Sequence, residues 1–139
     1  MSDGDIRSSW LLEGSGWAPD SADHDTGEQS TSPAGLRERY LRDGWPRQLG
    51  NLASTLARLG AHAEDARFDA IVGDLLREGA LMIEWSATHV PPNQVATLAM
   101  MQRELILWRH LWPHGPARPL LALRARAMAD HLLTVAGLV

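Results

Sequence analysis

The sequence predicts an all-α protein: an antiparallel bundle of four main helices plus a short preceding helix, with a disordered N-terminal tail. Apolar residues recur every three or four positions over most of residues 34–139, which is the spacing of an amphipathic helix. The period-two alternation typical of strands is absent, and one Tyr and one Phe add little strand propensity. Short connections make sequential helices neighbours, as in an antiparallel bundle.

Composition fits one modest helical domain with an extension. The chain has 139 residues, of which 45% are hydrophobic and 22% are charged. We expect a disordered acidic tail over residues 1–33 and a helical bundle domain over residues 34–139. The tail holds seven acids and one arginine, a formal charge of −6 in a chain of −4. Residues 13–33 have too few apolar groups to offset the entropy cost of ordering them.

Four apolar side chains in the tail form a short motif with acidic neighbours: Trp10, Leu11, Leu12 and Trp17. We interpret this motif as a linear docking segment that orders on binding, with the aromatic rings as anchors and the acids as steering charge. It would dock on a partner or on the bundle of its own chain. A chance apolar island is the alternative interpretation.

End signals define the first two expected helices. Ser32 and Pro33 suit an N-cap and a first helical position, and Gly44 closes the short helix. The next helix starts at Trp45 and ends near residues 60–62. Its core-facing stripe is Leu49, Leu52, Ala53, Leu56 and Leu59.

The longest helix is expected from about Glu64 to Thr88, because Pro91 and Pro92 end it by removing hydrogen-bond donors. At 1.5 Å per residue this helix would be about 36 Å long. Its expected stripe is Phe68, Ile71, Val72, Leu75, Gly79, Met82, Ile83 and Ser86.

Two further helices complete the expected bundle. One opens at Pro92 or Asn93 and runs to Trp112, and the Pro/Gly-rich residues 112–119 form a turn. The last spans about Leu120 to Ala136. The expected stripes are Val95, Leu98, Met101, Leu105, Trp108 and Trp112 on the first, and Leu121, Met128, Leu132, Val135 and Leu138 on the second.

Motifs of common enzyme and metal sites are missing from the sequence. There is no cysteine, and neither Ser54 nor Ser86 lies in a G-x-S-x-G elbow. Phosphate-binding glycine motifs, Glu-x-x-His and H-E-x-x-H are also absent. His110 and His114 have the spacing of a zinc pair, but Pro113 between them indicates that the helix has ended. We therefore expect no enzyme activity, no cofactor and no metal site.

Carboxylates at core-facing positions leave one alternative open. Glu78 follows the line of the apolar stripe, and a buried acid requires a partner. Arg109 or Gln102 on the next helix could supply it as a polar clasp. The alternative function is a small-ligand-binding bundle that uses Glu78, Arg109 and the tryptophans, including Trp112. Glu84 is a second carboxylate of this kind.

Arginines on the last two helices raise the question of nucleic acid. Arg118, Arg124 and Arg126, with Arg103 and Arg109, could form a basic face for phosphates. The chain is negative overall, so we favour a solvated helix face and do not expect nucleic-acid binding.

Tryptophan and methionine supply the remaining candidates. Trp85 and Trp108 lie at the edges of their stripes, and we take them as exposed anchors for a partner protein. Ordinary core packing is the competing interpretation. Met82, Met100, Met101 and Met128 could line a site for an apolar ligand.

Three stretches carry a resemblance: GWPRQLGNLASTLARL, LLREGALMIEW and HLLTVAGLV. Over residues 44–139 the chain resembles uncharacterised small helical proteins of cyanobacteria. The resemblance favours a cytoplasmic location and implies no activity or site residue.

Taken together, these patterns favour a non-enzymatic, cytoplasmic interaction module. We expect it to bind a protein partner and to self-associate through the helices at 64–88 and 92–112. No apolar run reaches the roughly 20 residues that a membrane span needs.

Overall fold

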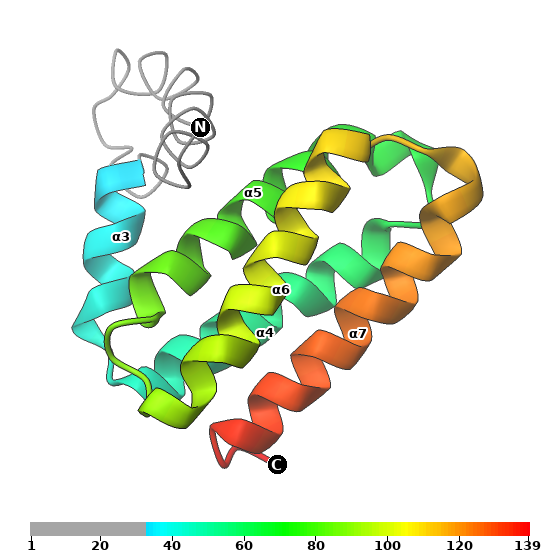
Figure 1. Cartoon of the computed structure of the whole chain (residues 1–139). Helices are drawn as coiled ribbons and strands as arrows, with labels where there is room; N and C mark the ends of the chain where they lie inside the picture. Colours follow the sequence, from blue (N-terminus) through cyan, green and yellow to red (C-terminus); the bar gives the residue numbers. More distant parts are fainter. Residues whose placement is uncertain (1–32) are drawn as a thin grey trace, which may run out of the picture. The chain divides into compact units, whose positions relative to one another are not determined.

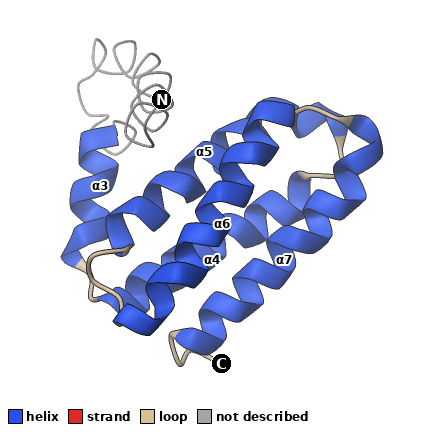
Figure 2. Ribbon diagram, viewed as in Figure 1, coloured by secondary structure: helices blue, strands red, loops and turns tan. Residues whose placement is uncertain are grey.

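The structure, a computed structural model, describes residues 33–139 of the chain. Within these residues it consists of helices and loops, without a strand (Figure 2). The elements are α3 (Pro33–Arg42), α4 (Trp45–His62), η2 (Ala66–Phe68), α5 (Asp69–Ser86), α6 (Pro92–Leu111), η3 (Gly115–Ala117) and α7 (Arg118–Val135). The predicted all-α fold class is confirmed for these residues.

The chain divides into two units, Met1–Tyr40 and Leu41–Val139. The second unit contains α4, α5, α6 and α7, and consecutive helices in it run antiparallel (Figure 1). Helix α4 packs against α5 and α7, and α5 also packs against α6. The backbones of α6 and α7 approach each other less closely than those pairs do. The side of the bundle between α6 and α7 is therefore its most open side.

Proline begins three of the four bundle helices. Pro46, Pro92 and Pro119 stand in the first turns of α4, α6 and α7. Proline suits this place because its φ is already helical and the N–H it lacks would have no partner within the helix.

Helix α5 begins differently, and its predicted bounds are wrong. The Asp65 side chain accepts a hydrogen bond from the backbone N–H of Arg67, which starts the short helix η2. Hydrogen bonds from Arg67 also lower the pKa of Asp65 to about 2. The α-helix follows at Asp69 and ends at Ser86, so its 18 residues span about 27 Å.

The core of the bundle is made of the predicted stripes, without some of their outer members. Ile71, Val95 and Leu138 were expected on the buried faces and are exposed instead. Each lies toward an end of its predicted stripe. The largest fully buried apolar side chains are Leu49, Leu52, Leu56, Leu59, Val72, Leu76, Ile83, Leu98, Leu105, Leu121 and Leu132.

Two glycines allow close approach between neighbouring helices of the bundle. A Cβ at Gly60 would lie 3.3 Å from the backbone oxygen of Ala122 on α7. A Cβ at Gly79 on α5 would lie 3.2 Å from a Leu105 methyl carbon on α6 and 3.4 Å from a Leu56 methyl carbon on α4. The distances of 3.2 and 3.3 Å are tighter than most real Cβ contacts, so Gly60 and Gly79 lie where two helices approach closely.

Helices long and apolar enough to cross a bilayer are not found in the part of the chain that the structure describes.

Candidate functional site

Exposed apolar side chains gather on the outer surface of α6 and α7. Met100, Leu107 and Leu111 are seven and four residues apart on α6, so they share one side of the helix. Leu120 and Leu123 occupy the exposed side of α7. These five side chains are between 51% and 69% exposed. We refer to them as the α6–α7 face.

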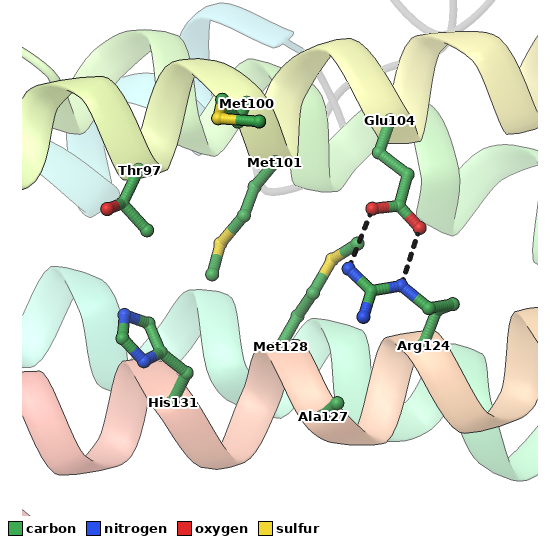
Figure 3. Close-up of a pocket in the computed structure, with 8 residues that line it drawn as sticks. All are labelled: Thr97, Met100, Met101, Glu104, Arg124, Ala127, Met128 and His131. Carbon is green, nitrogen blue, oxygen red and sulfur yellow. Dashed lines mark hydrogen bonds and ion pairs between the residues drawn. The ribbon is translucent and has the colours of Figure 1, made fainter.

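A pocket of about 320 Å³ lies between the same two helices (Figure 3). Met101 from α6 and Met128 from α7 reach into the space between the helices, and both are buried. Thr97 and His131 flank the space farther along. The lining is Thr97, Met100, Met101, Glu104, Arg124, Ala127, Met128 and His131. Methionine suits such a place because its flexible thioether adapts to different neighbours.

An ion pair bridges the two helices beside the pocket. Nε and Nη2 of Arg124 donate to the two carboxylate oxygens of Glu104, each at 2.9 Å (Figure 3). The Trp108 indole N–H also donates to Glu104, at 3.3 Å. Hydrogen bonds from Arg124 are the main cause of a lowered pKa for Glu104, which partial burial opposes. The carboxylate is therefore kept charged and fixed in position.

A second cluster joins helix ends away from the pocket. Nη2 of Arg118 donates to Asp69 at 2.9 Å, and its guanidinium lies 5.1 Å from the Trp112 ring centroid. The Trp112 indole N–H donates to the backbone oxygen of Asp69 at 3.2 Å. This cluster ties the end of α6 and the start of α7 to the start of α5. Its polar groups are engaged with one another, so we interpret it as a structural junction.

Glu78, the carboxylate singled out in the sequence, pairs with α4 rather than with α6. Its Oε1 lies 3.5 Å from Nη2 of Arg58 and accepts a hydrogen bond from Thr55 at 3.4 Å. Gln102 instead donates to the backbone oxygen of Ala80 at 3.0 Å. The expected clasp between Glu78 and α6 does not form, because Glu78 projects from the side of α5 that meets α4.

The proposed ligand residues Glu78, Arg109 and Trp112 have contacts in different parts of the bundle. Arg109 lies near enough to Arg77 to contribute to lowering the pKa of that guanidinium, after desolvation as the main cause. Trp112 lies beside Asp69, nine residues from Glu78, which is about 13 Å along α5. None of Glu78, Arg109 and Trp112 lines the methionine pocket. Three of the four methionines named for an apolar ligand do line it, Met82 being the exception.

Arginines of the expected basic face are largely engaged within the bundle. Arg118 pairs with Asp69, Arg124 pairs with Glu104, and Arg126 donates to the backbone oxygen of Gly60 at 3.4 Å. Phosphate binding would have to compete with these contacts.

The structure describes two of the tryptophans that the sequence predicted as anchors for a partner. Trp85 and Trp108 are both half-buried, so neither is the freely exposed anchor that the sequence predicted. Trp108 still belongs to the site, because it hydrogen-bonds to Glu104. The tail motif Trp10, Leu11, Leu12 and Trp17 lies outside the described residues.

Two further observations concern a buried carboxylate oxygen and the arrangement of potential metal ligands. Oε1 of Glu84 is buried and has no hydrogen-bond partner, although the rest of that residue is half-exposed. Among residues 33–139, no group of three His, Asp or Glu side chains is placed to hold a metal ion.

Sequence reasoning missed the exposed leucines and the ion pair. The spacing of Met100, Leu107 and Leu111 is a second apolar stripe on α6, and this signal was available in the sequence. Glu104 and Arg124 are twenty residues apart, and only the antiparallel pairing of α6 with α7 brings them together.

Comparisons of this chain with protein-family models, with curated proteins and with solved structures found no match. The resemblance to cyanobacterial helical proteins therefore stays a prediction. The fold and the surface define a helical bundle with one open, apolar side.

Proposed function

We propose that the chain is a non-enzymatic helical interaction module that associates with a second copy of itself through the α6–α7 face. A cytoplasmic location belongs to the same proposal, because a chain without cysteine offers no disulfide that would favour an oxidising compartment. The observation that carries the proposal is the clustering of five exposed large apolar side chains on two adjacent helices. Contiguous apolar surface of this kind marks interaction sites.

The choice of helices rests on where the exposed apolar side chains are. On α5 the only large hydrophobic residue that is exposed is Ile71, whereas α6 and α7 share the five residues of the face. The interface is therefore proposed on α6 and α7, in place of the pairing of α5 with α6 that the sequence favoured.

The dimensions of the face suit a modest dimer. Helices α6 and α7 contain 20 and 18 residues, which makes the face about 30 Å long and about 20 Å wide. The resulting area is on the order of 600 Å² per copy, compared with about 800 Å² that a standard interface buries on each partner. We therefore expect an association that depends on protein concentration.

The proposal is tested by light scattering of the full chain after size-exclusion chromatography, over a range of concentrations. We expect a mass that rises toward that of a dimer, and we expect Leu107→Glu with Leu120→Glu to return the chain to a monomer. Val95→Glu is the matched control. Val95 is also exposed on α6, but it lies about 140° around the helix from Met100. A wild-type chain that stays monomeric at all concentrations contradicts the proposal.

Binding of a small apolar ligand is the second candidate, and the methionine-lined pocket is the observation that favours it. The residues involved would be Met101, Met128 and Trp108 rather than the Glu78 set. The test is a titration with 1-anilinonaphthalene-8-sulfonate, in which the tryptophan fluorescence of the chain is the readout. Met128→Trp fills the pocket and should abolish binding of the dye. Equal binding to both chains would place the dye elsewhere.

A further inference from the structure

The Glu104–Arg124 pair lies among the apolar residues of the α6–α7 face and adds two opposite charges to this surface. Its two charges lie at the same level along antiparallel α6 and α7. They lie on opposite sides of the line between the two helices, which we call the α6–α7 seam. Side-chain exposure is 27% for Glu104 and 45% for Arg124, so both charges remain accessible from outside. Any copy that packs on this face must place some group against each of them.

A two-fold dimer can form on this face with its axis in either of two directions. If the axis crosses the seam at the level of the pair, α6 of the second copy lies over α6 and Glu104 lies over Glu104. The two arginines then also face each other. If the axis runs along the seam, α6 of the second copy lies over α7, and Glu104 lies over Arg124. Like charges placed together cost several kcal/mol in an interface, whereas opposite charges fix the register.

We infer that the self-association surface is a two-fold interface whose axis runs along the α6–α7 seam, with Glu104 and Arg124 of two copies forming an alternating square of four charges. This inference rests on the proposed function, because it specifies the partner arrangement at the same face.

Apolar residues of the face match in the same arrangement. One turn beyond Glu104 on α6 is Leu107, and the corresponding turn of antiparallel α7 carries Leu120. An axis along the seam keeps each residue at its own level, so Leu107 lies over Leu120 of the second copy. With the same axis, Met100 on the opposite side of the ion pair lies over Ala127 of the second copy, a large side chain over a small one. The apolar residues are compatible with this axis, and the charges select it.

Charge balance also favours a second copy over a strongly charged partner at this site. Each Glu104 is matched by one Arg124 within the chain, so the square adds no net charge when two copies meet. Paired acidic and basic groups allow the same surface to serve both sides of an isologous contact.

The test uses the double reversal Glu104→Arg/Arg124→Glu in the full chain. The reversed chain keeps the pair within each copy and keeps the alternating square when it meets another reversed chain. A wild-type copy meeting a reversed copy places Glu over Glu and Arg over Arg. We therefore expect each chain to self-associate and the mixed dimer to be strongly disfavoured, which is specificity through a repulsive element.

Native mass spectrometry of an equal mixture gives the readout. The reversal leaves the mass unchanged, so the wild-type chain carries a nitrogen-15 label. Random association would make about half of the dimers mixed, and we expect a mixed fraction roughly tenfold lower. The control is Arg58→Glu/Glu78→Arg, which reverses the ion pair between α4 and α5 outside the face. This control should mix at random with wild type.

The outcomes separate the inference from the proposed function. Dimers that mix freely in both experiments overturn the charge square but leave self-association in place. Monomers throughout overturn the proposed function itself. If the reversed chain does not fold, Glu104→Arg alone and Arg124→Glu alone provide a second test. Each should self-associate less than wild type, and their mixture should recover the dimer. A mixture that recovers nothing overturns the inference.

Discussion

Arg118 and Asp69 are joined through both terminal nitrogens of the guanidinium, Nη1 and Nη2, and both carboxylate oxygens, although forty-nine residues separate them in the chain. The pair connects the first residue of α7 to the first residue of α5. Arg118 also donates to the backbone oxygen of Ala63, which follows the last residue of α4. One side chain therefore fixes how three helix ends meet. Arginine is suited to this position because its planar fork fits a carboxylate at two points.

Replacement of this arginine by lysine should lower the thermal unfolding midpoint even though the charge is kept. Lysine cannot donate from two nitrogens in one plane or stack on Trp112 in the same way. Arg118→Ala should lower the midpoint further. Thermal denaturation followed by circular dichroism gives the measurement, with Arg103→Lys on the exposed part of α6 as the control. Equal midpoints for wild type and Arg118→Lys would show that the fork geometry is unimportant.

Acid should weaken the same junction. Hydrogen bonds from Arg118 hold the pKa of Asp69 below its ordinary value of 3.8. A carboxylate with a lowered folded-state pKa stabilises the fold above its ordinary pKa, and this contribution is lost as the pH falls through the lowered value. We expect urea unfolding at pH 7 and at pH 2 to differ less for Asp69→Asn than for wild type. An unchanged difference would remove Asp69 from the acid response.

Two glycines should respond oppositely to alanine. Gly73 on α5 has nothing within 4 Å of the place a Cβ would take, so Gly73→Ala should stabilise the fold by about 0.5–1 kcal/mol through helix propensity. A Cβ at Gly60 would lie 3.3 Å from the backbone oxygen of Ala122, which cannot move without shifting α7. Gly60→Ala should therefore destabilise the fold. Chemical denaturation of both variants decides the matter, and a gain in both would mean that α4 and α7 separate easily.

The fold could be predicted from sequence because apolar periodicity depends on neighbouring residues alone. The stripe of α4 is buried as predicted, from Leu49 to Leu59. The start of α5 could not be placed in this way, because the Asp65 side chain hydrogen-bonds with Arg67 and delays the helix. Helical spacing continues through this turn, so the pattern gives no sign of the interruption.

The site was less accessible to sequence reasoning than the fold. Glu78 was predicted to face α6 because the direction of its side chain was inferred from a single apolar stripe on α5. Helix α5 packs against two neighbours, so it has two buried sides. The partner of Glu104 depends on the register between α6 and α7, which local spacing does not determine. The exposed leucines were visible as a second stripe, but their exposure follows from the open side of the bundle.

Chemical cross-linking at positions 107 and 120 tests the self-association face most directly. The chain has no cysteine, so Leu107→Cys and Leu120→Cys each introduce a single thiol. A short bismaleimide added to an equal mixture of the two full-length chains should give covalent dimers, because Leu107 of one copy lies over Leu120 of the other. Either chain alone should give far fewer. A mixture that yields no more dimer than the separate chains would contradict the proposed packing of α6 and α7 on a second copy.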